Sequence, residues 1–250
     1  MILSLLLLFL SAQYGIECAK FIKQNRIVGG AAANIEDFPW QVAIYTSNKY
    51  YCGGSIYSAT VIITAAHCIE TMYLDTLTVR AGSSYVDYGG VTRRVANGIY
   101  HRGFGEHNKY DIALLRLESR LPLGKGIQTI RLTKYTPAAG TRVTVSGWGL
   151  THNKGSAAKR LLSVTMSIID RSVCASSRYG YGSNIQDTMM CAVEPNKDAC
   201  RGDSGGPLVA NNELVGVVSW GFDCAHPRYP GVFADVAKLR DWIKMTSKVV

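Results

Sequence analysis

Short segments rich in Val, Ile, Thr and aromatic residues recur along this chain of 250 residues, and each has the length of one β-strand. They lie at residues 40–45, 61–64, 77–82, 111–117, 142–149 and 214–221. Gly, Asn, Ser or Pro residues bound them, which is typical of strands that end in turns. No helical periodicity fills the intervals between them. This spacing predicts an all-β barrel or sandwich.

One segment near the C-terminus has the period of an α-helix instead. Val236, Leu239, Trp242 and Ile243 recur at three- and four-residue steps, so they share one helix face. Asp235 precedes them and is a suitable N-cap. In the middle of the chain, residues 121–140 are rich in Gly, Pro and Thr. We expect this stretch to connect two β halves.

The N-terminus predicts the compartment. Residues 1–10 are apolar except for Ser4, and small residues follow them. Such a run is shorter than the ~20 residues that cross a bilayer, and it matches a secretory signal peptide. A buried N-terminal helix is the alternative interpretation. Secretion implies an oxidising environment, in which cysteines pair, yet the chain has 7 cysteines, an odd number.

Composition excludes several classes of protein. Only 18% of the residues are charged, and they are not clustered, which argues against a disordered chain or a coiled coil. The formal net charge is +9, but the basic residues are dispersed in short pairs. A surplus without a basic cluster is weak support for nucleic-acid binding. We therefore expect no nucleic acid as a partner, and because no second apolar run approaches transmembrane length, we expect no membrane either.

Three motifs carry the chemistry. TAAHC at residues 64–68 contains His67, YDIALLRL at 110–117 contains Asp111, and GDSGGP at 202–207 contains Ser204. A serine hydroxyl is a poor nucleophile at neutral pH and needs a base, which a histidine oriented by an aspartate supplies. In this order, the three motifs resemble the trypsin-like serine proteases of the chymotrypsin family. The resemblance extends from Arg26 to about Ile243.

The resemblance implies a fold and a domain organisation. The expected fold is all-β, with two perpendicular six-stranded antiparallel β-barrels and a C-terminal α-helix. The expected segments are a signal peptide at 1–15, an activation propeptide at 16–26 and a peptidase domain at 27–250. Within that domain we expect the first barrel at about 27–125, the second at about 126–234 and the helix at about 235–246.

The resemblance also implies the site residues. The catalytic residues would be His67, Asp111 and Ser204, and the backbone N–H groups of Gly202 and Ser204 would form the oxyanion hole. Asp198 would lie at the base of a specificity pocket and select Arg or Lys in the substrate. The pocket walls would be formed by Ser219, Trp220, Gly221 and Gly231. Ala199 offers no hydroxyl to a lysine ammonium, so we expect Arg to be preferred over Lys.

Activation is implied by the Arg26–Ile27 junction. Cleavage after Arg26 would free the Ile27 amine to pair with Asp203, by resemblance to the family's zymogens. The activating enzyme would be another trypsin-like protease or the protein itself. The removed segment contains Cys18, which leaves six cysteines. The family's bridges would pair Cys52 with Cys68, Cys174 with Cys191, and Cys200 with Cys224.

No cofactor and no metal are expected. Residues 83–93 correspond to a calcium-binding loop in vertebrate relatives, but here they contain only one carboxylate, Asp87. The expected partners are protein or peptide substrates with Arg or Lys and protein protease inhibitors, and the expected state is a monomer. Two other functions stay open, namely a non-catalytic protease homologue that binds a partner and a cationic binding protein. Hydrolysis of an Arg-containing substrate after cleavage at Arg26 would distinguish them.

Overall fold

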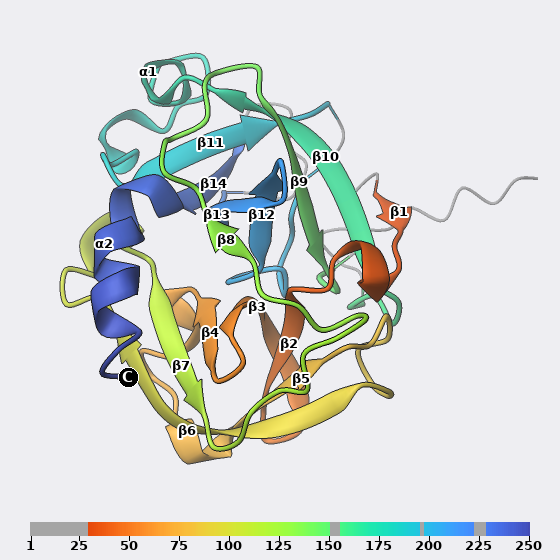
Figure 1. The fold of residues 1–250 in the computed structure, drawn as a ribbon. Coiled ribbons are helices and arrows are strands. Elements are labelled where there is room, and N and C mark those ends of the chain that lie inside the picture. Colours follow the sequence, from red (N-terminus) through yellow and green to blue (C-terminus); the bar gives the residue numbers. More distant parts are fainter. Residues whose placement is uncertain (1–29, 151–155, 196–197, 223–228) are drawn as a thin grey trace, which may run out of the picture.

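A computed structural model describes residues 30–150, 156–195, 198–222 and 229–250 (Figure 1). Strands dominate it, and they form two closed six-stranded antiparallel barrels. The first barrel contains β2 (Gln41–Thr46), β3 (Lys49–Ser58), β4 (Val61–Thr64), β5 (Leu77–Ala81), β6 (Val91–Tyr100) and β7 (Ala113–Leu117). The second contains β9 (Arg142–Gly147), β10 (Leu162–Ile169), β11 (Met189–Val193), β12 (Pro207–Ala210), β13 (Glu213–Trp220) and β14 (Gly231–Asp235).

Each barrel closes by pairing of its outer strands. The first runs β2-β3-β4-β7-β6-β5, and β5 pairs back onto β2. The second runs β10-β11-β14-β13-β12-β9, and β9 pairs back onto β10. Buried and partly exposed residues alternate along β5 and β10, because successive side chains of a strand point to opposite faces. Closure pairs every barrel strand on both sides and so protects the sheet edges.

Shorter elements attach to the barrels. β1 (Ala31–Ala32) pairs with β10, and β8 (Arg131–Leu132) runs parallel to β13. β8 lies between β7 and β9 within the Gly- and Pro-rich connection. α1 (Arg171–Cys174) follows β10. The 3-10 helices are η1 (Ile35–Asp37), η2 (Ala66–Cys68), η3 (Leu74–Thr76), η4 (Glu106–Asn108) and η5 (Gly182–Asn184).

The C-terminal helix α2 (Val236–Thr246) follows the last barrel strand and packs against β8, β13 and β14 (Figure 1). Asp235 caps it, since its Oδ1 accepts hydrogen bonds from the N–H groups of Ala237 and Lys238. Val236, Leu239 and Ile243 are buried in a hydrophobic cluster that joins first-barrel residues to residues of β8, β12, β13 and β14. The expected helix and its cap are therefore confirmed. No helix in the described ranges has both the length and the apolar character needed to cross a membrane.

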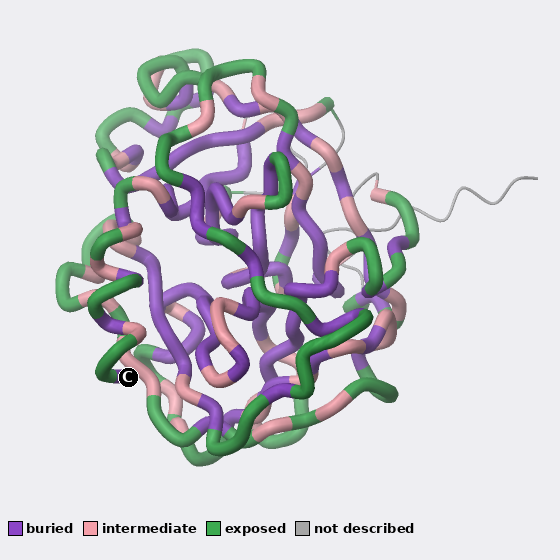
Figure 2. Tube along the Cα trace, viewed as in Figure 1, coloured by how far each residue is buried: buried purple, intermediate pink, exposed green. Residues whose placement is uncertain are grey.

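The six segments expected to be strands correspond to β2, β4, β5, β7, β9 and β13. Two six-stranded barrels and a C-terminal helix confirm the expected fold. Sequence patterns did not identify β3, β6, β10, β11, β12 and β14. Burial is highest within the two barrels and where they meet (Figure 2).

The contact between the barrels is made by backbone as much as by side chains. The Gly53 N–H of β3 donates to the Ser204 carbonyl over 2.8 Å. A Cβ on Gly53 would lie 3.0 Å from Gly206 Cα, so this approach requires a residue without a side chain. Ser146 Oγ of β9 donates to Gln41 Oε1 of β2 over 2.6 Å. These contacts hold the turn that contains Ser204 against the first barrel.

Candidate active site

Asp111 is the buried centre of a hydrogen-bond cluster at the barrel interface. Its carboxylate Oδ2 lies 2.7 Å from His67 Nδ1, and its Oδ1 accepts the His67 backbone N–H over 3.0 Å. Ser219 Oγ donates to Oδ2 over 2.5 Å. Because an ionised carboxylate only accepts hydrogen bonds, the contact requires a proton on Nδ1. The imidazole therefore offers its other nitrogen, Nε2, as a base.

His67 is held in place by its neighbours in sequence. It belongs to η2, which directly follows β4, and the Cys52–Cys68 disulfide ties that short helix to β3. Thr64, the last residue of β4, donates its hydroxyl to the Gly53 carbonyl over 2.9 Å. The His67 side chain is 28% exposed, against 1% for Asp111. The ring thus has a buried anion on one side and access to solvent on the other.

Asp111 is presented by an unusual backbone turn. Tyr110, which precedes it, has a left-handed φ of 59°, and this conformation costs an aromatic residue about 1–2 kcal/mol. The His101 ring stacks on Tyr110 with the ring centroids 4.3 Å apart, and Trp242 of α2 packs against His101. Burial lowers the pKa of His101, which favours a neutral ring in this stack. The C-terminal helix therefore supports the turn that presents Asp111.

Ser204 lies in a turn that depends on glycine. Gly202 and Gly205 have φ values of 94° and 76°, which residues with a side chain rarely adopt. A Cβ on Gly205 would collide with Thr64 Oγ1. The turn therefore approaches the strand that leads to His67, although no hydrogen bond joins the Ser204 hydroxyl to the His67 ring among the described residues. In a structure without substrate, catalytic hydrogen bonds are often longer than in the substrate complex.

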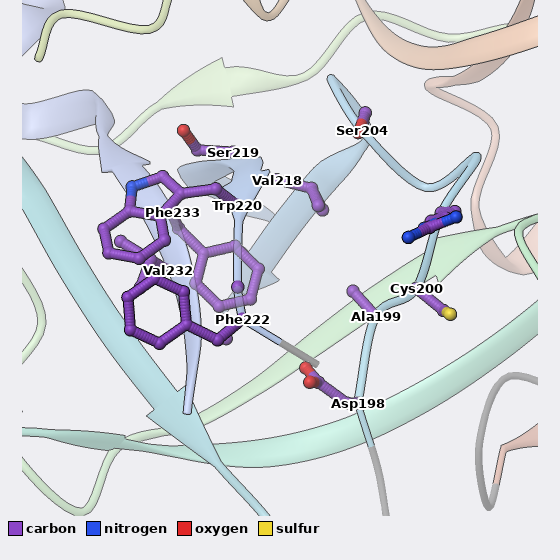
Figure 3. Close-up of a pocket in the computed structure, with 13 residues that line it drawn as sticks. Asp198, Ala199, Cys200, Ser204, Val218, Ser219, Trp220, Phe222, Val232 and Phe233 are labelled. Carbon is purple, nitrogen blue, oxygen red and sulfur yellow. The ribbon is translucent and has the colours of Figure 1, made fainter. Parts of the chain in front are cut away.

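A cavity of about 230 Å³ lies next to this turn. Figure 3 shows the Asp198 carboxylate at one end of the cavity and Ser204 at the other. Asp198 is 4% exposed, and a Cβ on Gly231 would lie 2.8 Å from its Oδ1. Among the described residues, no atom lies within 4 Å of a Cβ built on Gly221, so this position leaves open space beside them. The cavity therefore suits a long side chain with a positively charged end.

The remaining lining residues agree in part with the sequence analysis. Ser219 and Trp220 line the cavity as expected, and Ala199 lies close to Asp198 (Figure 3). Phe222 also lines it and was missed. Its ring packs against Trp220 and Tyr181, with centroid distances of 5.7 Å and 4.9 Å. Its place as an aromatic residue directly after the Trp220–Gly221 wall is the sequence signal that could have identified it.

Asp203 is a buried carboxylate beside the Ser204 turn. It is 0% exposed, and it accepts the N–H groups of Gly149 and Cys200 over 2.8 Å and 2.9 Å. Burial raises the pKa of Asp203 to about 6, and the two N–H donors oppose this rise. None of the ion pairs between described residues involves Asp203. The carboxylate therefore lacks a cationic neighbour in the described part of the chain.

Comparison with known proteins agrees with this geometry. The Trypsin family profile matches residues 27–243. The chain belongs to the trypsin family. It is 50% identical to trypsin alpha of Drosophila melanogaster over 229 residues, which cover 90% of this chain and 89% of the relative. It is also 50% identical to hypodermin-A of Hypoderma lineatum, over 88% of this chain and 86% of that protein.

A structural comparison gives the same result. The mouse serine protease neuropsin matches with a TM-score of 0.80 and 30% identity, over 87% of this chain and 98% of that chain. Together with the named trypsins, this match makes the chain a trypsin-like serine endopeptidase that acts on protein substrates. The resemblance inferred from the three motifs is therefore confirmed.

Two of the three disulfides expected of a trypsin-family chain lie between described residues. Cys52–Cys68 and Cys174–Cys191 have S–S distances of 2.02 Å and 2.01 Å. Cys224, the expected partner of Cys200, lies outside the described residues. Arg26 and Ile27, which form the expected activation junction, also lie outside them.

One cluster within the described ranges has the composition of a metal site, namely Cys52, His67 and Cys68. Both cysteines form a disulfide with each other, so neither offers the thiolate that binds a metal. We therefore assign the cluster to the support of His67. Two contacts at the site were missed by the sequence analysis, from Ser219 to Asp111 and from Tyr50 to Gly202.

Proposed function

We propose that this protein cleaves peptide bonds after Arg, and less efficiently after Lys, through an acyl-enzyme. One observation carries the proposal: a single cavity has a buried carboxylate, Asp198, at one end and Ser204 at the other (Figure 3). A substrate guanidinium beside Asp198 would place the following carbonyl carbon near the Ser204 hydroxyl. The pair formed by His67 and Asp111 supports the chemical step at that end.

The proposed reaction has two halves. In the first, Ser204 Oγ attacks the carbonyl carbon while its proton passes to His67 Nε2, and the proton then goes to the leaving amine. Asp111 stabilises the imidazolium that forms in between. The N–H groups of Gly202 and Ser204 bind the oxyanion, and each such donor contributes roughly 3–4 kcal/mol to transition-state stability. In the second half, water repeats the sequence on the acyl-enzyme and releases the product acid.

The preference for Arg follows from Ala199. A guanidinium can form two parallel hydrogen bonds with the Asp198 carboxylate, whereas a lysine ammonium depends on further acceptors nearby. Ala199 lines the cavity without offering a hydroxyl. A hydrogen bond to a charged group contributes about 1.5–3 kcal/mol, which corresponds to about 10- to 100-fold in kcat/KM.

We therefore expect Ala199→Ser to raise kcat/KM about 10-fold for a Lys peptide and to change it little for the matched Arg peptide. The added hydroxyl would accept a hydrogen bond from the ammonium. Ala139→Ser adds the same hydroxyl at an exposed position and serves as the control. Equal rates on the two peptides before the substitution, or an unchanged ratio after it, would contradict the proposed preference.

We propose that the protein is secreted and made as a zymogen, activated by cleavage after Arg26. The apolar N-terminus supports secretion. Asp203 supports the activation step, because an ionised carboxylate buried without a cationic partner destabilises the fold. The ammonium freed at Ile27 would offer that partner, and pairing with it would order the turn that contains Gly202 and Ser204.

This proposal predicts a pH dependence in the uncleaved chain. The pKa of Asp203 is about 6 in the folded state and about 3.9 in an unfolded chain, so the unfolded state loses its proton first. The contribution of Asp203 to the unfolding free energy is then largest below about pH 4 and falls as the pH rises to about 6. Relative to Asp203→Asn, the uncleaved chain should lose about 2 kcal/mol of unfolding free energy between pH 4 and pH 8.

Denaturant unfolding at the two pH values measures this loss. Arg26→Gln keeps the chain uncleaved. Ser204→Ala is added both to the chain with Asp203 and to the Asp203→Asn variant, so that neither digests itself. In the chain cleaved after Arg26, the loss should shrink or change sign, because the Ile27 ammonium stabilises the ionised carboxylate. An identical loss in the cleaved and uncleaved chains would contradict the proposed pairing.

The proposed function itself is tested by cleaving the chain at Arg26 with immobilised trypsin and removing that enzyme. We expect hydrolysis of an Arg peptide that stops after treatment with a serine-directed reagent. A cleaved chain that binds benzamidine, which mimics the end of an Arg side chain, but hydrolyses nothing would favour the non-catalytic homologue. A cleaved chain that neither binds nor hydrolyses would favour the cationic binding protein.

A further inference from the structure

We propose that Tyr50 is a positioning residue for the oxyanion hole; this inference rests on the proposed function of the Ser204 turn. Tyr50 lies in β3 of the first barrel, whereas Gly202 precedes Ser204 at the second barrel. The Tyr50 hydroxyl donates a hydrogen bond to the Gly202 carbonyl over 2.5 Å. One side chain thus crosses the barrel interface to hold the residue whose N–H would bind the oxyanion.

The other carbonyls of the turn that accept hydrogen bonds are held by backbone N–H groups. The carbonyls of residues 200, 201, 203 and 204 accept N–H groups from Asp203, Leu150, Gly206 and Gly53, respectively, over 2.7–2.9 Å. The Gly202 carbonyl differs, because its donor is the Tyr50 hydroxyl. A side-chain substitution can therefore release the turn at this carbonyl, whereas no side-chain substitution removes the other four donors.

Gly202 is also the residue whose backbone would change most if this hydrogen bond were lost. Its φ of 94° lies in the region that only glycine enters readily, and glycine has many other conformations available. The hydrogen bond between the Leu150 N–H and the Arg201 carbonyl orients the peptide that includes the Gly202 N–H. The Tyr50 hydrogen bond orients the next peptide. Together they fix both sides of Gly202, and with them the direction of its N–H.

The Tyr50 ring is itself well supported. It packs edge-to-face against Tyr45 and Trp148, with centroid distances of 6.1 Å and 6.2 Å. A Cβ on Gly202 would lie 3.4 Å from Tyr50 Cε1, so the ring also lies against the turn. Burial, together with the nearby Asp203 carboxylate, raises the pKa of Tyr50 well above its usual value. The hydroxyl therefore stays protonated and remains a donor over the working pH range.

Tyr50→Phe removes the hydroxyl and keeps the ring that packs against Tyr45 and Trp148. Because an oxyanion-hole donor contributes about 10²- to 10³-fold to kcat, we expect a misdirected Gly202 N–H to lower kcat by about 10- to 100-fold. KM for the Arg peptide should change less than about 3-fold, since the Asp198 pocket is untouched. Tyr45→Phe is the matched control, because the neighbouring Tyr45 hydroxyl donates to the Val86 carbonyl and not to the Ser204 turn.

Two inhibitors separate positioning from general loosening of the site. A peptide aldehyde ending in Arg forms a hemiacetal with Ser204, whose oxygen occupies the oxyanion hole, whereas benzamidine occupies only the Asp198 pocket. In Tyr50→Phe we expect the aldehyde to bind more weakly by about the same factor as kcat falls, and benzamidine to bind unchanged. Tyr45→Phe should change neither the affinity for either inhibitor nor kcat.

Three results would overturn the proposal: unchanged kcat and aldehyde affinity in Tyr50→Phe, an equal loss in Tyr45→Phe, or benzamidine weakened as much as the aldehyde. These results differ from a failure of the proposed function, because hydrolysis of the Arg peptide by the unsubstituted protein is measured in the same experiment. If that protein does not hydrolyse the peptide, the proposed function fails instead.

Discussion

Ser204→Ala is expected to lower kcat on an Arg peptide by about 10⁵-fold or more, with little change in the affinity for benzamidine. The substitution removes the hydroxyl of the glycine-rich turn that lines the cavity and lies against the strand leading to His67. Without it no acyl-enzyme forms, and the residual rate comes only from binding and from the oxyanion hole. Active-site titration with a serine-directed reagent should show no labelling.

Ser183→Ala removes a hydroxyl from the exposed helix η5 and is the matched control. It should leave kcat unchanged. The double variant His67→Ala, Ser204→Ala should have a kcat hardly lower than that of either single variant, because the two residues act as one unit. Substantial hydrolysis by Ser204→Ala, or additive losses in the double variant, would exclude Ser204 as the nucleophile activated by His67.

Asp198→Asn is expected to have the second-largest effect, a fall in kcat/KM for Arg peptides of about 30- to 5,000-fold. Removing one partner of a buried charge pair costs 2–5 kcal/mol or more, because the other charge is left without compensation. Asp198 is 4% exposed, so the substitution changes a buried group that lines the cavity and not a surface charge. Measuring kcat/KM separates this loss from a loss in the chemical step alone.

A substrate with citrulline in place of Arg supplies the control, since citrulline has nearly the same shape without the charge. Its slow hydrolysis should not decrease further in Asp198→Asn. Asp241→Asn removes the same charge from the exposed face of α2 and should leave both substrates unaffected. If both substrates lost the same factor in Asp198→Asn, the carboxylate would serve the fold and not the recognition of charge.

Local patterns in the sequence predicted much of this structure. β-branched and aromatic runs between turn residues predicted β2, β4, β5, β7, β9 and β13, since such side chains favour the strand conformation wherever they lie. The 3.6-residue period and Asp235 predicted α2 and its cap. β10 escaped notice although its buried apolar residues alternate with Ser and Thr over most of its length, which is the pattern of a half-buried strand. β3 escaped because Gly53 and Gly54 interrupt its apolar pattern.

The residues of the site also divide into those that the sequence identified and those that it did not. His67, Asp111 and Ser204 could be named from motifs, because each needs a particular local backbone: a short helix after β4, a turn before β7, and a glycine-rich turn before β12. Their partners could not be named. The Ser219 hydroxyl reaches Asp111 across 108 residues of sequence, and Tyr50 reaches Gly202 across 152. No pattern near Tyr50 distinguishes its hydroxyl from that of Tyr51 next to it.

The sequence by itself determined the strand-rich fold, the C-terminal helix and the identity of the reacting side chains, since conformational preference and side-chain chemistry are local properties. The tertiary structure alone decided which groups support them. Barrel closure and the Gly53–Gly206 approach bring residues distant in sequence to within hydrogen-bonding distance. Burial then raises the pKa of Asp203, and the turn between Asp198 and Ser204 becomes one wall of a cavity. These effects depend on the surroundings of a side chain, and those surroundings exist only in the folded chain.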